Sequence, residues 1–169
     1  GLTGLANRRC LDERLARDCA DWRGPLALLL VDADCFKQLN DALGHLHGDE
    51  CLRRLARICA GFAADEADLA ARYGGDELAL VLPGRGEAEA MAIAERLRQR
   101  VEEAAMAHPV SVVAPWVTVS VGVNVAAPGQ ARTPARLLSG ADRALYAAKS
   151  QGRNRIAAAM PPRDGNGGR

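Results

Sequence analysis

The chain has 169 residues, a formal net charge of +1, and 49% hydrophobic residues. This length suits one domain with a sizeable core, and the near-zero charge excludes bulk electrostatic binding to nucleic acid. The apolar run at residues 26–31 is too short to span a membrane, and no secretory signal pattern opens the chain. We therefore expect a cytoplasmic domain without nucleic-acid or membrane contact of its own, which could be the cytoplasmic part of a membrane-anchored protein.

The first half of the chain predicts a helix over residues 7–22, a strand over 26–31, and helices over 36–43 and 48–62. Leu11, Leu15 and Cys19 recur every four residues, which is typical of one buried helical face. The continuous apolar run at 26–31 favours a strand covered on both sides. Gly44 is expected to end the short helix.

The second half predicts a hairpin of strands at 69–73 and 77–82, a helix at 87–107, a strand at 117–125, a helix from 133 to about 150, and a strand at 155–158. Helices and strands mix without strict alternation, so we expect an α+β fold with a central, mostly antiparallel sheet flanked by helices. The domain should cover residues 1–160. Residues 161–169 are rich in Pro and Gly and are expected to form a disordered linker or tail.

The five cysteines do not suggest a disulfide framework. Their number is odd and no two have Cys-x-x-Cys spacing, which also argues against a structural zinc site. They are Cys10, Cys19, Cys35, Cys51 and Cys59. Free thiols in a reducing compartment are the expected state.

Acidic residues follow the predicted strand at 26–31. Asp32 and Asp34 are two residues apart, so they share one side of the chain while it stays extended. A carboxylate at a strand end can hold a divalent cation, and the carbonyl of Ala33 could add an oxygen ligand. Both carboxylates could equally cap the next helix, and the spacing alone leaves the two interpretations open.

The second candidate site is the turn at residues 72–77, which reads Arg-Tyr-Gly-Gly-Asp-Glu. Two glycines allow a tight turn and the close approach of a ligand to the backbone. The neighbouring acids Asp76 and Glu77 repel each other unless a cation is present. A solvated hairpin turn would use the same residue types, so the motif taken alone stays ambiguous.

Basic residues at the expected helix ends could neutralise a phosphate-bearing ligand. Lys37, Lys149 and Arg153 occupy such positions, and a triphosphate needs several cationic partners. Each of them singly could be an ordinary surface charge. His45 and His47 are not interpreted as metal ligands, because no further ligand is evident nearby.

Taken together, these segments resemble the GGDEF domain of diguanylate cyclases. The resemblance runs from residue 2 to about residue 156. Six segments match in order, at residues 2–9, 32–41, 44–49, 72–78, 120–122 and 141–154. Six ordered matches are far more specific than any one of them.

The resemblance implies a palm-like nucleotidyl-cyclase fold and a reaction in which two GTP molecules give cyclic di-GMP and two pyrophosphates. Two Mg²⁺ or Mn²⁺ ions per site would stabilise charge on the attacking and leaving oxygens. Each subunit would hold one GTP, so catalysis would require a two-fold homodimer. A sensor or phosphodiesterase domain fused to this one is a further implication.

The resemblance also implies roles for single residues. Asp76 and Glu77 would be catalytic acids and metal ligands, joined at the metal by Asp32 and the Ala33 carbonyl. The substrate-binding residues would be Phe36, Lys37, Asn40, Asp49, Gly74, Gly75, Lys149 and Arg153. Among these, Lys37, Lys149 and Arg153 would hold the β- and γ-phosphates. Gly74 and Gly75 would leave room for the ribose and α-phosphate, and Asn40 and Asp49 would recognise the guanine base.

Two departures from the family pattern bear on activity. Leu78 stands where the family usually has phenylalanine, which could loosen the turn or leave a void beneath it. The family's product-inhibition motif, Arg-x-x-Asp, here reads Asp65-Glu66-Ala67-Asp68. An acid at position 65 would repel the phosphates of cyclic di-GMP, so Asp65 and Asp68 are expected to form a degenerate inhibitory site.

Two hypotheses of function result. The first is an active diguanylate cyclase. The alternative is a catalytically weak GTP-binding regulatory domain that controls a fused domain such as a cyclic di-GMP phosphodiesterase. Turnover of GTP in a dimeric form of the protein separates them.

Overall fold

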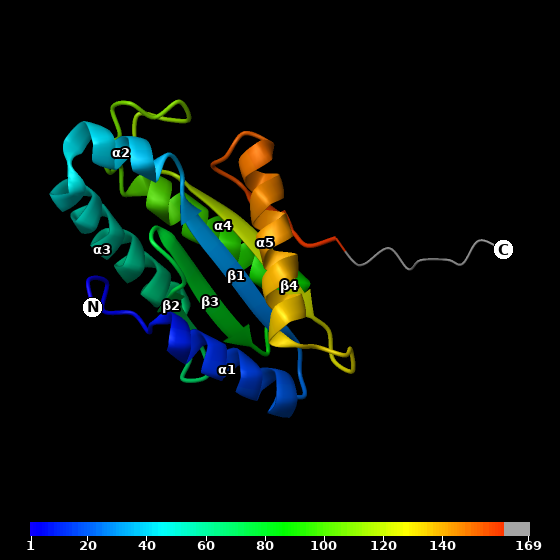
Figure 1. Ribbon diagram of the computed structural model, residues 1–169. Helices are drawn as coiled ribbons and strands as arrows, with labels where there is room; N and C mark the ends of the chain where they lie inside the picture. The colour runs from blue at the N-terminus through cyan, green and yellow to red at the C-terminus, as the bar shows by residue number, and fades with distance from the viewer. Residues whose placement is uncertain (161–169) are drawn as a thin grey trace.

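A five-stranded sheet in the order β2-β3-β1-β4-β5 forms the centre of the computed structural model, which describes residues 1–160 (Figure 1). Neighbouring strands are antiparallel except β5, which runs parallel to β4. The expected mostly antiparallel sheet is therefore confirmed. The predicted tail at 161–169 lies outside the described residues. The strands are β1 (Leu26–Ala33), β2 (Leu69–Arg72), β3 (Glu77–Pro83), β4 (Val119–Ala126) and β5 (Ile156–Ala158).

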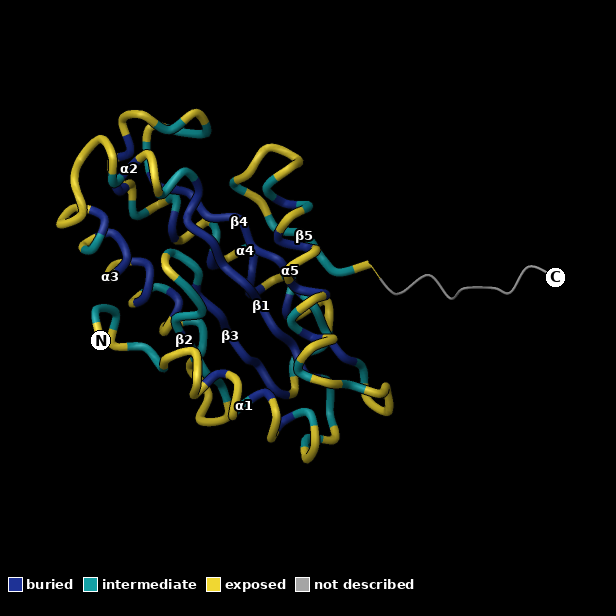
Figure 2. Tube along the Cα trace, in the orientation of Figure 1, coloured by how far each residue is buried: buried dark blue, intermediate teal, exposed yellow. Residues whose placement is uncertain are grey.

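The central strand β1 is buried over all eight of its residues (Figure 2). It lies between β3 and β4, so both of its edges are hydrogen-bonded and both of its faces are covered. Its continuous apolar sequence suits that position. The strand runs two residues beyond the predicted end at Val31, because Asp32 and Ala33 also pair with neighbouring strands.

Two layers of helices enclose the sheet, and Figure 1 shows α1 and α5 in front of it and α4 behind. Leu28 and Leu30 of β1 pack in one core cluster with α1 and α5, whereas Leu29 and Val31 pack in the other with α3 and α4. Among the helices of residues 1–160, none combines the length and apolar character needed to cross a membrane. The helices are α1 (Arg8–Asp21), α2 (Phe36–Leu43), α3 (His45–Phe62), α4 (Glu87–Glu103) and α5 (Pro134–Ser150).

Two helix boundaries differ from the prediction for backbone reasons. Helix α3 begins at His45 rather than residue 48, because Gly44, with φ of 83°, both ends α2 and starts α3. Helix α4 ends at Glu103 rather than residue 107, because Ala105 adopts a left-handed φ of 45° and Ala107 pairs with Trp116. Local glycine and bridge geometry therefore override apolar periodicity at these ends.

Helix α5 approaches β4 so closely that Gly122 has no room for a side chain. A Cβ added there would lie 2.2 Å from the carbonyl oxygen of Ala141 and 2.3 Å from the amide nitrogen of Leu145. Both are backbone atoms and cannot rotate away. The glycine thus sets the distance between the sheet and the helix that carries Lys149.

Replacing Gly122 with alanine should lower the free energy of unfolding by at least about 2 kcal/mol, because the added methyl group overpacks the α5–β4 contact. Urea unfolding followed by circular dichroism measures this. Gly61→Ala is the matched control: Gly61 is exposed on α3 with nothing within 4 Å of an added Cβ, so its stability should hold or rise. Equal stabilities of the two variants would contradict the close approach.

Candidate functional site

Three acids gather at the C-terminal end of β1. The sheet register places Asp32 directly opposite Glu77 of β3, with Ser120 of β4 on its other side. Directly paired residues share a face of the sheet, so Asp32 and Glu77 both face the α5 side. Asp76 precedes Glu77, and its carbonyl accepts a hydrogen bond from the Ala33 amide at 3.4 Å. The structure therefore brings together the four residues expected at a metal site.

Lys149 of α5 reaches these acids. Its Nζ lies 2.9 Å from Oδ2 of Asp32, whose side chain is only 10% exposed. Burial raises the pKa of Asp32 to about 6 although the Lys149 ammonium lowers it, and the neighbouring Asp76 and Glu77 raise it further. The ionised carboxylate is thus poorly compensated by one lysine.

This electrostatic state fits a divalent cation, because a cation would relieve the repulsion among the three acids. Within residues 1–160, no three His, Cys, Asp or Glu side chains are already grouped closely enough to hold an ion. Binding would therefore require small side-chain adjustments, with Lys149 giving up Asp32.

The turn between β2 and β3 is held by its own backbone and by Arg72. The amides of Tyr73 and Gly74 donate to the Glu77 carbonyl at 2.9 and 3.2 Å. The guanidinium of Arg72 donates to the Gly75 carbonyl at 2.6 Å and to the Gly74 carbonyl at 3.2 Å. The sequence contained Arg72 in the motif but gave no sign that it ties the loop.

The two glycines of this turn are not required by backbone conformation, since neither has a left-handed φ. Their lack of a side chain matters instead. Gly75 is exposed with nothing within 4 Å of an added Cβ, whereas one on Gly74 would be 3.0 Å from Oε2 of Glu77. The turn therefore presents bare backbone beside the acids.

The corner between α2 and α3 brings together the residues predicted to bind a base. A Cβ on Gly48 would lie 1.8 Å from Oδ1 of Asn40 and 3.2 Å from Cζ of Phe36, so both side chains lie against this glycine. Asp49 follows it and is half-buried. In the described part of the chain, Oδ1 of Asn40 is buried without a hydrogen-bond partner.

The other two predicted phosphate ligands are exposed. Lys37 lies in the first turn of α2, and Arg153 lies in the turn that follows α5. Neither side chain has an ion-pair partner among residues 1–160. Lys149 alone of the three cations touches the acid cluster in this structure.

Asp34 has a different environment from Asp32. It is 2% exposed and accepts hydrogen bonds from Oγ1 of Thr118 and Oγ of Ser120, each at 2.7 Å, and from the Asn154 amide at 3.0 Å. Neither acid caps the following helix, because the N-cap of α2 is Cys35 and no side chain bonds there. The capping interpretation is therefore wrong.

The two acids of the degenerate motif contact an arginine that the sequence did not single out. Arg85, in the loop after β3, pairs with Asp65, with Asp68 at 3.5 Å and with Glu89 at 3.0 Å. Oδ2 of Asp68 also accepts from the Asp65 amide at 3.1 Å. Burial raises the pKa of Asp68. The acids are thus engaged within the protein.

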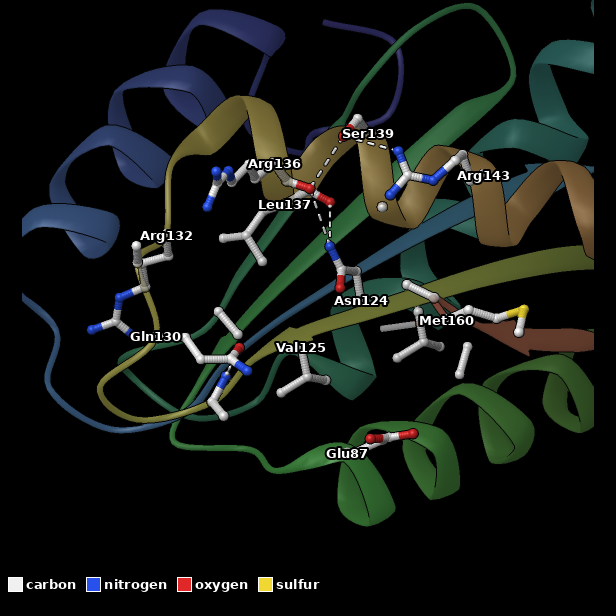
Figure 3. A pocket seen from close by; sticks show the side chains of 17 residues that line it. Glu87, Asn124, Val125, Gln130, Arg132, Arg136, Leu137, Ser139, Arg143 and Met160 are labelled. Atoms are coloured by element: carbon white, nitrogen blue, oxygen red, sulfur yellow. Dashed lines mark hydrogen bonds between the residues drawn. The ribbon is translucent and has the colours of Figure 1, made fainter. Parts of the chain in front are cut away.

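A cavity of about 630 Å³ lies at the opposite end of the sheet (Figure 3). It lies between the C-terminal half of β4, the start of α5 and Glu87 of α4. The sheet register places this end near Leu26, about 20 Å along β1 from Asp32. Among the described residues that line this cavity, Glu87 is the only acid, so the cavity is not the site formed by Asp32, Asp76 and Glu77.

Comparisons with known proteins match the chain to one family. The family model described as "Diguanylate cyclase, GGDEF domain" matches residues 1–155. Response regulator PleD of Caulobacter vibrioides is 40% identical over 161 residues, covering 92% of this chain and 34% of PleD. Diguanylate cyclase TpbB of Pseudomonas aeruginosa is 39% identical over 168 residues, covering 96% of this chain and 38% of TpbB. The chain thus spans little more than a third of these curated relatives.

Solved structures share the fold. The GGDEF domain of DgcB from Caulobacter crescentus, in complex with c-di-GMP, superposes with a TM-score of 0.85 at 36% identity, covering 95% of this chain and 92% of that one. The active GGEEF domain of a diguanylate cyclase from Vibrio cholerae gives a TM-score of 0.77 at 34% identity, covering 93% and 99%.

Replacing Asp32 with asparagine should change the pH dependence of stability when divalent cations are removed by a chelator. The folded pKa of about 6 lies above the ordinary 3.8, so ionising Asp32 costs the wild type stability as pH rises through that window. The unfolding free energy of Asp32→Asn minus that of the wild type should therefore increase by about 2 kcal/mol from about pH 4 to about pH 7. Urea titrations across this range measure it, and a constant or falling difference would contradict the burial argument.

Proposed function

Since the chain belongs to the GGDEF domain family of diguanylate cyclases, we propose that it condenses two GTP molecules into cyclic di-GMP with release of two pyrophosphates. The observation that carries the proposal is the meeting of Asp32, Asp76 and Glu77 at the end of a buried strand, beside Lys149. Such a cluster is suited to nucleotidyl transfer, in which a 3′-hydroxyl attacks the α-phosphate in line with the departing pyrophosphate.

The acids would hold Mg²⁺ or Mn²⁺ through Asp32, the Ala33 carbonyl, Asp76 and Glu77. Such ions supply positive charge that stabilises the attacking and leaving oxygens. With Asp32 in that role, Lys149 would be free to bind the β- and γ-phosphates together with Lys37 and Arg153. Gly74 and Gly75, the bare backbone of the turn, leave room for the ribose and α-phosphate.

The α2–α3 corner would recognise guanine. A carboxylate such as Asp49 can accept from both the N1–H and the 2-amino group of guanine, a donor pair that adenine lacks. The Oδ1 atom of Asn40 is buried without a hydrogen-bond partner in the described part of the chain. If the Asn40 side chain turned outward, an N–H group of the base could donate to this oxygen. Phe36 also lies against Gly48 and provides an apolar surface beside the proposed base site.

The active form would be a two-fold dimer. One domain binds one GTP, so each 3′-hydroxyl must meet the α-phosphate held by the partner. The chain covers 34% of the length of PleD and 38% of TpbB, so we further propose that a fused sensor or phosphodiesterase domain brings two copies together. We place this reaction in the cytoplasm, where free thiols persist.

The alternative, a GTP-binding regulatory domain of weak activity, draws support from Leu78. This residue stands where the family usually has phenylalanine, and the smaller side chain could loosen the turn. It is 1% exposed and belongs to the core cluster beneath the turn. The bonds of Arg72 to the turn support the catalytic proposal, because they hold the loop independently of the side chain at position 78.

Activity is tested with the chain fused to a dimeric coiled coil and supplied with GTP and Mg²⁺. Asp76→Ala should lower the rate of cyclic di-GMP formation by at least about a thousandfold, because it removes a proposed metal ligand. Asp21→Ala, which alters an exposed acid at the end of α1, is the control and should keep the wild-type rate. Binding of GTP without product formation by the wild-type dimer would favour the regulatory alternative.

The motif containing Asp65 and Asp68 should not bind product tightly. Asp65 would repel the cyclic di-GMP phosphates, and both acids already pair with Arg85. Titration calorimetry should show no cyclic di-GMP binding that depends on this motif. Tight binding that is lost in Asp68→Ala and kept in Glu66→Ala would refute this expectation.

A further inference from the structure

The turn that carries Arg153 has an unfavourable backbone conformation. Arg153 and the next residue, Asn154, have left-handed φ values of 64° and 46°. A left-handed φ is unfavourable for a side chain such as arginine, and asparagine tolerates it better. Such a turn persists only where surrounding contacts hold it.

Contacts from three other elements hold this turn. Oδ2 of Asp34, at the end of β1, accepts from the Asn154 amide at 3.0 Å. Arg98 of α4 donates to Oδ1 of Asn154 at 2.9 Å, and the Arg153 amide donates to the Ala148 carbonyl of α5 at 3.1 Å. Glu102 of α4 accepts from the Asn154 side chain at 3.4 Å.

Asp34 is the most firmly anchored of these partners. Its carboxylate is 2% exposed and also accepts from Ser120 of β4 and from Thr118, the residue just before β4, each at 2.7 Å. It follows Asp32 and Ala33 directly, and its donor Ser120 is the register partner of Asp32. One buried carboxylate therefore joins the acid end of β1, the start of β4 and the Arg153 turn.

We propose that Asp34 is a positioning residue, which fixes Arg153 relative to Asp32 and so places its guanidinium for the distal phosphates of GTP. The inference rests on the proposed function, because Arg153 is assigned to those phosphates there. Arg98 supports the same turn from α4. Asp34 acts through geometry and does not itself touch metal or nucleotide.

This role depends on hydrogen-bond acceptance more than on charge. In Asp34→Asn, the amide oxygen can keep the Asn154 and Thr118 bonds, while the amide nitrogen donates to the Ser120 hydroxyl, which can also accept. In Asp34→Ala all three bonds are lost. A metal ligand would behave differently, since the neutral asparagine would impair it almost as strongly as alanine.

The test compares binding of GTP and GMP by calorimetry in the presence of Mg²⁺, because GMP lacks the phosphates assigned to Arg153. Asp34→Ala should weaken GTP binding about tenfold and GMP binding less than about twofold. Asp34→Asn should recover most of the lost GTP affinity. Combined with Arg153→Ala, the Asp34→Ala change should cause no further loss, as expected for two residues that act through one contact.

Amide hydrogen exchange of Asn154 follows the turn without any ligand. Protection should fall in Asp34→Ala and persist in Asp34→Asn. If Asp34→Ala does not fold, Arg98→Met can be used instead, because it removes a hydrogen bond to the same turn from α4. This variant should also lose GTP affinity and keep GMP affinity, with a smaller loss than Asp34→Ala.

Four results would each overturn the proposal. The first two are equal losses of GTP and GMP affinity in Asp34→Ala, and an Asp34→Asn variant that binds GTP as weakly as Asp34→Ala. The others are additive effects of Asp34→Ala and Arg153→Ala, and an Asn154 exchange rate that is unchanged in Asp34→Ala. Failure of the wild type to bind GTP would instead refute the proposed function. The exchange measurement would still decide whether Asp34 holds the turn.

Discussion

Two carboxylates lie at the buried end of the central strand, and neither can remain there as an uncompensated charge. Asp32 meets the ammonium of Lys149, and Asp34 accepts three hydrogen bonds. These partners come from β4, from α5 and from the turn before β5. Satisfying the two acids therefore fixes the arrangement of this whole end of the sheet. The close α5–β4 packing at Gly122 makes the arrangement possible, because it brings the helix bearing Lys149 within reach.

The two acids differ in how completely they are satisfied. Asp34 has its acceptor capacity engaged by donors of the protein, which suits a structural role. Asp32 keeps a raised pKa of about 6, because burial and two neighbouring acids outweigh one lysine. Incomplete compensation of this kind is typical of sites that bind a charged partner. Asp34 is thus held as an anchor by its three hydrogen bonds, and Asp32 is the carboxylate that we propose for cation binding.

Local sequence signals predicted the main elements, because short-range patterns cause them: the apolar run of β1 and the break at Gly44 are examples. The members of the site came from resemblance, since single motifs were ambiguous. Long-range partners could not be read from the sequence. Asp34 bonds to residues 84, 86 and 120 positions away, and Arg85 meets Asp65 across 20 positions. Such pairings depend on strand register and helix packing, which no local pattern encodes.

We propose that one chain supplies half of a site that condenses two nucleotides. The most direct measurement is the initial rate of cyclic di-GMP formation by the unfused chain over a range of protein concentrations, at saturating GTP and Mg²⁺. We expect a rate that rises with the square of protein concentration while the domain is mostly monomeric, because each product needs two loaded domains. A rate strictly proportional to protein concentration throughout a range in which the chain is monomeric would contradict it.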